Sequence, residues 1–292
     1  VKGVGGMVMI GSSKTQSAGN WDYYLVKVDD DGNVIWEHRY GGNQVEEGHA
    51  VAVTHENDGY IFTGFTSSFG AGRNDVYVVR VDLNGDTIWT RTYGTEDHDV
   101  AYSIARANDS GYIIAGRTYS PENNWDVLLL KIADDGEFSW SRTFGGMNWD
   151  EAYSVEPTPD GGYIVGGLTQ SFGFGATDVY IIKTDAIGNL EWSKTLGGSN
   201  HERCYKVKVL NDGYLISGRT MTYGMGGYDF YLIRTDLNCN IIWEQTAGGE
   251  SIDKSFDCVI TDSHDYILTG YTESFGSGKA DVYIVKLSDM QE

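Results

Sequence analysis

The sequence contains little proline and little cysteine. Only 3 of its 292 residues are proline, and the three cysteines are Cys204, Cys239 and Cys258. Three cysteines cannot all pair with one another, and none of them lies in a CxxC or Cys/His metal spacing. The sequence therefore implies neither a disulfide framework nor a zinc site, although a single disulfide stays open.

Positive charge is also scarce. The chain has 21 Lys and Arg against 42 Asp and Glu, which gives a net charge of −21. Nucleic acids and anionic membrane surfaces attract basic proteins, so this balance argues against both as partners. No apolar run reaches the roughly 18 residues of a membrane-spanning helix, so we expect no membrane span.

A helical period is absent as well. The sequence has instead 39 glycines and 13% aromatic residues. Many glycines among β-branched and aromatic residues are typical of short strands joined by tight turns. The composition therefore predicts an all-β protein.

One pattern recurs along the whole chain at intervals of 51 to 53 residues. The tryptophan column consists of Trp36, Trp89, Trp140, Trp192 and Trp243. An aspartate column consists of Asp22, Asp75, Asp126, Asp178, Asp229 and Asp281. A cation column follows five residues later, at Lys27, Arg80, Lys131, Lys183, Arg234 and Lys286. We place a second acidic column at Glu47, Asp99, Asp150, Glu202 and Asp253. Several independent columns with one period establish an internal repeat.

Each repeat contains four short hydrophobic runs. Within residues 161–212 the runs are "GYIVGG", "DVYIIKTD", "LEWSKT" and "CYKVKV". Their length and composition predict strands, and "DAIGN" between the second and third is a hairpin turn in which glycine takes a positive φ. Cys239 replaces that glycine in "DLNCN", so we expect this turn to be strained or differently shaped.

A unit of four antiparallel strands that repeats about every 52 residues predicts a β-propeller blade. The runs "DGGYIVGG" (160–167), "DVYIIKTDAIGNLEW" (178–192) and "TLGG" (195–198) resemble repeats common in secreted and surface proteins of bacteria and archaea. They also look distantly similar to the repeats of quinoprotein-type propellers, but no quinone-binding motif matches. The resemblance implies a propeller and little about activity, because this fold hosts many functions.

We predict a single β-propeller domain over 1–292 with six blade positions. The repeat units are 1–58, 59–110, 111–161, 162–212, 213–264 and a partial unit at 265–292. The last unit contains only its first two strands, so we expect a two-stranded sixth blade. Either it stays thin or a partner completes it, or a longer natural chain supplies the missing strands.

The repeats differ mainly in two sets of loops. Because neighbouring strands are antiparallel, the loops after the first and third strands of each unit emerge on one face. These loops vary between units, whereas the turns on the other face are short and alike. Variable loops on a rigid scaffold are where binding sites usually lie, so we place the functional site on this loop face.

Aromatic residues on the loop face do not follow the repeat. Trp21, Trp125 and Tyr228 stand just before the aspartate column, and Trp149 lies in a neighbouring loop. Aromatic faces beside amides can stack on a sugar ring and bind its hydroxyls. The predicted ligand-binding residues are Trp21, Trp125, Trp149, Tyr228, Asn123 and Asn124. We place the site in the third unit, which contains both Trp125 and Trp149. The alternative is that these aromatics only pack between blades, as we expect of the periodic tryptophans.

The acidic columns allow two interpretations. Their carboxylates could bind calcium, with Asp22, Asp75, Asp126, Asp178, Asp229 and Asp281 as candidate ligands. Because every unit repeats them, we favour carboxylates that accept backbone N–H bonds from the glycine-rich loops. We therefore expect no cofactor, with calcium as the alternative.

Two histidine–acid pairs are candidates for catalysis. His98 precedes Asp99, and His201 precedes Glu202, both on the loop face. Such a pair could abstract a proton in a polysaccharide lyase or act as acid and base in a glycoside hydrolase. The two histidines lie in different units, and no known catalytic motif accompanies them.

The sequence therefore favours an extracellular or cell-surface propeller that acts as a binding or scaffold module. Its predicted partner is a glycan, or else another extracellular protein. The alternative is a polysaccharide-degrading enzyme with its active site on the same face. In that case one histidine should lie within hydrogen-bonding reach of a carboxylate, in a cleft that also contains an Arg or a Tyr.

Overall fold

The computed structural model describes residues 1–3, 5–14, 20–120, 124–263 and 265–288. It divides into two compact units, Val1–Met147 and Asn148–Glu292. The described residues contain strands and no helix. No helix that could cross a membrane is therefore present among them.

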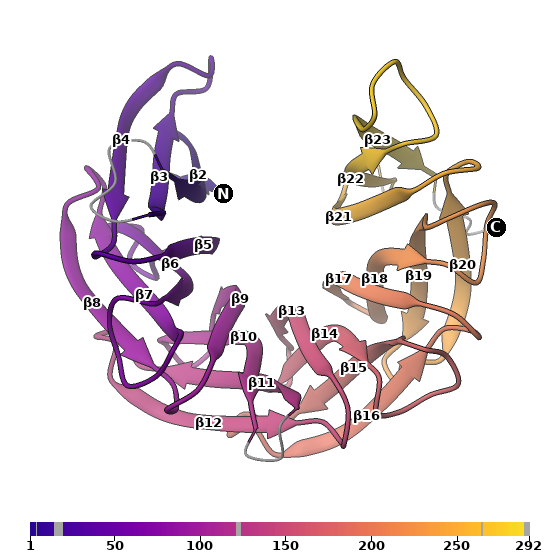
Figure 1. The fold of residues 1–292 in the computed structure, drawn as a ribbon, viewed down its shortest axis with the longest axis horizontal. Coiled ribbons are helices and arrows are strands. Elements are labelled where there is room, and N and C mark those ends of the chain that lie inside the picture. The colour runs from indigo at the N-terminus through magenta and orange to yellow at the C-terminus, as the bar shows by residue number, and fades with distance from the viewer. Residues whose placement is uncertain (4, 15–19, 121–123, 264, 289–292) are drawn as a thin grey trace. The chain divides into compact units, whose positions relative to one another are not determined.

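The first unit contains three sheets (Figure 1). The first sheet has strands β1 (Lys2–Gly3), β2 (Gly6–Ser13), β3 (Asp22–Val28) and β4 (Val34–Tyr40). The second has β5 (Glu46–Val53), β6 (Gly59–Thr66), β7 (Asp75–Asp82) and β8 (Thr87–Tyr93). The third has β9 (Asp99–Arg106), β10 (Tyr112–Tyr119), β11 (Trp125–Ile132) and β12 (Phe138–Phe144).

The second unit contains three more. The fourth sheet has β13 (Asp150–Pro157), β14 (Tyr163–Thr169), β15 (Asp178–Thr184) and β16 (Leu190–Leu196). The fifth has β17 (Glu202–Leu210), β18 (Gly213–Thr220), β19 (Asp229–Asp236) and β20 (Ile241–Ala247). The sixth has β21 (Asp253–Ile260), β22 (Tyr266–Thr272) and β23 (Asp281–Leu287).

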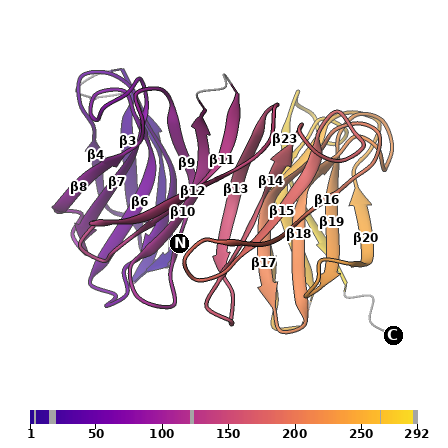
Figure 2. The same ribbon diagram turned by 90° about the horizontal axis from the view of Figure 1, so that it is seen from below.

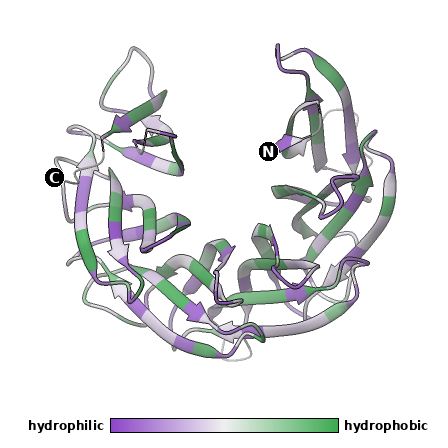
Figure 3. Ribbon diagram, turned by 180° about the vertical axis from the view of Figure 1, so that it is seen from behind, coloured by the Kyte–Doolittle hydropathy of each residue, from purple (hydrophilic) through white to green (hydrophobic). Residues whose placement is uncertain are grey.

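Every sheet is an antiparallel meander, and its loops gather at the two ends of the strands (Figure 2). The two middle strands of a full sheet are the most buried, whereas hydrophobic and hydrophilic residues alternate along the strands at its outer edge (Figure 3). Within each unit, hydrophobic clusters join neighbouring sheets face to face; one contains Val76 and Val78 of β7 with Ala101 and Ile104 of β9. Stacked four-stranded meanders of this kind are propeller blades. The chain is a six-bladed β-propeller, as the sequence predicts.

The blades begin one strand earlier than the predicted repeat units. The fourth run of each unit pairs with the first run of the next unit, so Glu202–Leu210 belongs with Gly213–Thr220. The tight turn between these two runs makes them neighbours in one sheet, whereas the longer loop after the third run passes to the next blade. The sixth blade therefore has three strands among the described residues, and the prediction of two is wrong.

The periodic tryptophans occupy equivalent positions on the outermost strands. Each lies opposite a residue of the cation column, as Trp36 lies opposite Lys27 and Trp192 opposite Lys183. The Trp36 indole donates a hydrogen bond of 3.1 Å to the Leu83 carbonyl of the next blade. All five are half-buried, which agrees with a role in packing between blades.

The cation column brings its charge to the turns opposite the loop face. Lys183 Nζ lies 2.9 Å from Asp160, and Arg80 lies 2.9 Å from Asp58. Both acids stand in the turn between the first two strands of their blade. Ion pairs of this kind recur in the second to sixth blades and stabilise the turns of that face.

Cys239 keeps the turn shape of its glycine counterparts. Its φ is 57°, in the left-handed region, and its N–H donates to the Asp236 carbonyl at 3.0 Å. Gly188 makes the same bond to Asp185. Of the two alternatives expected from the sequence, the turn is therefore strained and not differently shaped, and burial of the thiol in the core offsets the modest cost of a left-handed non-glycine residue.

Candidate functional site

The two sets of variable loops do emerge on one face of each blade. Isolated bridges connect them, joining Trp21 to Val45, Asn74 to His98 and Thr177 to His201. Each bridge places the residue before the aspartate column next to the last residue of the following loop. The loop positions whose residue type differs between repeats are therefore in contact within each of these pairs.

The aspartate column holds these loops together. Asp178 accepts backbone N–H bonds from Phe174 and Gly175 at 3.1 and 3.0 Å, and Asp75 accepts one from Gly72 at 3.0 Å. Asp22, Asp75, Asp178 and Asp229 are buried, while Asp126 and Asp281 are half-buried. In the described part of the chain, no group of three or more acidic, histidine or cysteine side chains is arranged to hold a metal ion.

The second acidic column begins at Glu46, not at Glu47. Glu46 is fully buried and accepts bonds from Gly42 N–H and Thr66 Oγ1 at 2.7 Å each. Glu202 does the same with Gly198 and Thr220. Glu46 stands ten residues after Trp36, which is the spacing of the other column members from their tryptophans. The sequence therefore contained the signal for the correct register.

The two acidic columns face each other within the loops. A methyl group on Gly248 would lie 2.1 Å from Asp229 Oδ1 and 2.7 Å from Asp253 Oδ2. Burial raises the pKa of Asp229 to about 6, the Met225 N–H bond opposes this rise, and the nearby Asp253 carboxylate adds to it. Burial also raises the pKa of Asp75 and of Asp178.

The predicted histidine–acid pairs do not form. Asp99 accepts the Thr95 N–H at 2.6 Å, and Glu202 is held by its own loop, so both carboxylates point into the loops. His201 Nδ1 lies 2.8 Å from Thr177 Oγ1, and the His98 ring packs 5.9 Å from Trp125. Because neighbouring residues along a strand point to opposite sides, adjacency in sequence separates these side chains.

In the first unit, Trp125 is half-buried and packed on both sides. The Arg117 guanidinium lies 4.1 Å from the centre of its ring, and Tyr119 meets it edge-on at 5.1 Å. The amide of Asn124 donates to the Gly146 carbonyl at 2.6 Å and braces the loop. Trp21 is more open, with 42% of its surface exposed. Asn123 lies outside the described residues.

In the second unit, two arginines stand directly opposite each other on paired strands. Arg203 of β17 is the register partner of Arg219 of β18. The Arg203 guanidinium donates to the Tyr153 hydroxyl at 2.8 Å and lies 3.9 Å from the Glu151 carboxylate. Among the described residues, Arg219 has no carboxylate within ion-pair distance. Burial lowers the pKa of Arg219, and Arg203 lowers it further.

Tyrosine rings surround these cations. Arg219 lies 4.1 Å from the centre of the Tyr228 ring, and Lys254 of the neighbouring blade lies 5.5 Å from the same ring. In the described part of the second unit, Lys254 also lacks a carboxylate partner. We call this group the cation–aromatic cluster; its members are Arg203, Arg219, Lys254, Tyr153, Tyr205, Tyr228 and Tyr271.

The cluster borders a hollow of about 220 Å³ at the loop face. Its lining residues are Trp149, Gln170, Thr177, His201, Glu202, Arg203, Arg219 and Tyr228. Trp149 thus joins Tyr228 in the second unit, whereas Trp125 belongs to the first unit. The prediction that Trp125 and Trp149 share the third blade is wrong, because the chain enters the fourth blade directly after Trp149.

Sequence reasoning missed Arg219 and Lys254. Both residues lie within strands, β18 and β21, and not in the variable loops. The strand position of Arg219 holds a different residue type in most blades: Ser12, Phe65, Arg117, Leu168, Arg219 and Tyr271. This variation on a repeated strand is as informative as variation in a loop.

Comparisons with known proteins show the fold. No protein-family model matches this chain, and no curated protein matches it. A solved protein of unknown function from Dyadobacter fermentans is similar, with a TM-score of 0.56 and 18% identity over 92% of this chain and 84% of that one.

Two further structures are similar at lower identity. The Dos1 propeller has a TM-score of 0.53 and 12% identity, over 100% of this chain and 74% of that one. Puromycin hydrolase has a TM-score of 0.53 and 13% identity, over 97% of this chain and 44% of that one. These similarities establish the propeller fold. They do not indicate an activity, which has to be inferred from the residues of the site.

Proposed function

We propose that this chain is an extracellular or cell-surface binding propeller whose ligand is an acidic carbohydrate. The observation that carries the proposal is the opposed pair Arg203 and Arg219. Like charges directly across a sheet repel each other, and Arg219 has no carboxylate to compensate it among the described residues. A bound anion would remove this repulsion.

The surroundings of the pair suit a sugar that bears a carboxylate or sulfate. Trp149 and Tyr228 supply ring faces in the hollow, and Gln170 and Thr177 supply polar groups for hydroxyls. Arginine binds planar carboxylates through two parallel hydrogen bonds, so it selects uronate sugars over neutral ones. The net charge of −21 disfavours anions at the surface in general, but the local positive charge of the cluster supports an acidic form of the glycan predicted from the sequence.

The test is binding of oligogalacturonate compared with a neutral oligosaccharide of equal length. We expect the parent to bind the acidic oligosaccharide, and Arg219→Gln to weaken this binding about 10- to 100-fold, because a hydrogen bond to a charged group is lost. Arg91→Gln is the matched control, since Arg91 also lies over an aromatic ring, that of Trp89, but on an outer strand. Equal binding of acidic and neutral sugars, or an unaffected Arg219→Gln, would contradict the proposal.

One observation favours a second function, a polysaccharide lyase. His201 lines the same hollow as both arginines and Tyr228. In a lyase a base removes the proton next to the uronate carboxylate, cations stabilise the resulting charge, and the glycosidic oxygen leaves. Glycoside hydrolysis has less support, because it needs two carboxylic acids in the site. Among the described residues that line the hollow, Glu202 is the only acid, and its carboxylate already accepts hydrogen bonds from Gly198 and Thr220.

Incubation with oligogalacturonate separates the two functions. A lyase produces an unsaturated uronate that absorbs ultraviolet light, and His201→Ala should abolish its formation. A binding module leaves the oligosaccharide intact, and His201→Ala then changes affinity modestly. Binding without product supports the binding module, whereas product formation supports the enzyme.

A further inference from the structure

The third blade lacks an aromatic pair that four other blades have. In each of these blades a loop aromatic packs on the tyrosine two residues after the aspartate column, with ring centres 5.5 to 5.7 Å apart. The pairs are Phe69–Tyr77, Phe172–Tyr180, Tyr223–Tyr231 and Phe275–Tyr283. The third blade has Leu128 at the tyrosine position, and its loop 120–124 contains no aromatic residue.

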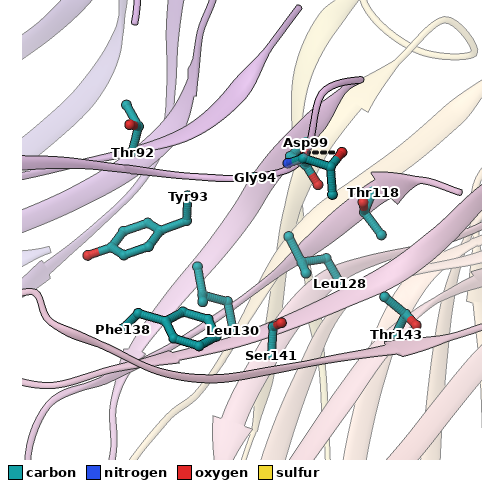
Figure 4. Close-up of a pocket in the computed structure, with 11 residues that line it drawn as sticks. Thr92, Tyr93, Gly94, Asp99, Thr118, Leu128, Leu130, Phe138, Ser141 and Thr143 are labelled. Atoms are coloured by element: carbon teal, nitrogen blue, oxygen red, sulfur yellow. Dashed lines mark hydrogen bonds between the residues drawn. The ribbon is translucent and has the colours of Figure 1, made fainter. Parts of the chain in front are cut away.

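A hollow of about 430 Å³ lies at this place, between the second and third blades of the first unit. Figure 4 shows the Tyr93 and Phe138 rings toward one end and Asp99 toward the other, with Leu128 and Leu130 between them. Leu128 and Leu130 are buried in the core that joins the two blades. The volume falls in the range of small-molecule sites, and the walls are mainly apolar.

The other blades also show where a ring hydroxyl at this place finds its partner. The hydroxyls of Tyr24 and Tyr231 donate to Glu37 and Glu244, which follow the periodic tryptophans Trp36 and Trp243. The Tyr77 hydroxyl is also hydrogen-bonded to the side chain of Thr90, which follows Trp89, with the Thr90 hydroxyl as the donor.

Ser141 is the equivalent residue of the third blade, because it follows Trp140. It lines the hollow, and in the described structure no phenol hydroxyl reaches it. The third blade therefore has a residue that can bond to a tyrosine hydroxyl, Ser141, but it has Leu128 where the other blades have the tyrosine.

We infer that this hollow binds a small molecule that carries a phenol ring. The ring takes the place of the missing tyrosine side chain against Leu128 and Leu130, and its hydroxyl bonds to Ser141. The internal repeat supports this assignment, because five blades have a tyrosine ring at this position: Tyr24, Tyr77, Tyr180, Tyr231 and Tyr283. It is independent of the cation–aromatic cluster, which lies in the other unit.

The test uses p-cresol, which is the tyrosine side chain without its backbone, and toluene, which lacks the hydroxyl. Ligand-observed NMR titration of the full chain should give saturable p-cresol binding, with a dissociation constant on the order of 1 mM for a ligand of this size. Toluene should bind about 3- to 10-fold more weakly, because it cannot make the hydrogen bond to Ser141.

Two variants decide the location. Leu128→Tyr restores the residue of the other blades and should abolish p-cresol binding while the protein stays folded. Ser141→Ala should lower the affinity for p-cresol to that for toluene and leave toluene unchanged, which keeps the test valid if Leu128→Tyr does not fold. No saturable p-cresol binding to the parent, or equal p-cresol binding by parent and Ser141→Ala, would overturn the inference.

Discussion

At the residue scale, Asp229 shows that burying a carboxylate in a repeated loop lowers stability at neutral pH. Its carboxylate is buried, accepts the Met225 N–H at 3.0 Å, and faces Asp253. One N–H bond does not compensate for burial and a second carboxylate, so the pKa of Asp229 rises to about 6. The Asp229 carboxylate bonds to the backbone of its loop, and yet the folded chain is more stable when that carboxylate is protonated.

This rise predicts a pH dependence of stability. A carboxyl whose pKa is higher in the folded state stabilises the fold below its unfolded pKa, near 4, and loses this contribution as pH rises through about 6. We therefore expect the free energy of unfolding to increase by about 1–2 kcal/mol from about pH 7 to about pH 5, since two pKa units are worth about 2.7 kcal/mol before solvent screening.

Calorimetry of Asp229→Asn checks it, because the amide does not titrate and the increase should shrink to the part that Asp75 and Asp178, whose pKa values are also raised, still contribute. Asp160→Asn is the control. The ion pair with Lys183 contributes to holding the pKa of Asp160 down to about 2, so its contribution is lost only in more acidic solution. If Asp229→Asn keeps the parent's dependence between about pH 7 and about pH 5, the assignment to Asp229 is wrong.

At the scale of the element, the first two strands of a blade are joined around a bulge. The register shifts between Gly48 and Ala50 of β5, opposite Gly64 of β6. A methyl group on Gly64 would stand 1.8 Å from the Glu47 carbonyl oxygen. Glycine is therefore required here by close backbone approach, which is a common role at bulges.

Gly11 provides the matched comparison, because it holds the same position in the first blade. That blade has only the short strand β1 beside β2, and nothing lies within 4 Å of a methyl group on Gly11. We expect Gly64→Ala to lower the free energy of unfolding by about 2–4 kcal/mol and Gly11→Ala to change it by less than about 0.5 kcal/mol. Chemical denaturation measures both, and equal effects would show that the bulge does not set the requirement.

At the scale of the whole molecule, neighbouring blades within each unit cover one another's apolar strands, whereas two apolar residues of β23 in the last blade are exposed. Val179 and Ile181 of β15 are covered by Cys204 and Val207 of the next blade. Their counterparts on β23, Val282 and Ile284, are 83% and 64% exposed. β23 is also an edge strand of its sheet, and exposed apolar edges favour association with another chain.

We therefore expect the chain to self-associate through β23. Sedimentation velocity should show a complex that dissociates on dilution, and the double variant Val282→Lys with Ile284→Lys should be monomeric with a nearly unchanged melting temperature. Ile187→Lys removes an exposed isoleucine from a turn and serves as the control. Association that persists in the double variant would place the contact elsewhere.

The sequence by itself determined the propeller, the period and the scaffold face. These features depend on local preferences: strand composition, hairpin turns and the tryptophan and cation columns. Because each repeat shows the same preferences, an ambiguous assignment in one repeat is resolved by the others. The same rules predicted that the variable loops share one face, since antiparallel strands leave no other arrangement.

Only the tertiary structure decided which strands form a blade and which residues form a site. A repeat period in the sequence does not show at which strand a blade begins. The first strand of each blade was therefore identified only from the hydrogen-bond pairing of the strands. The pairing of Arg203 with Arg219 and the turning of Asp99 away from His98 depend on register and on side-chain direction, which residue spacing does not fix. The hollow beside Leu128 depends on packing between two blades. A missing aromatic ring leaves a cavity only if the surrounding residues do not move in to fill the space.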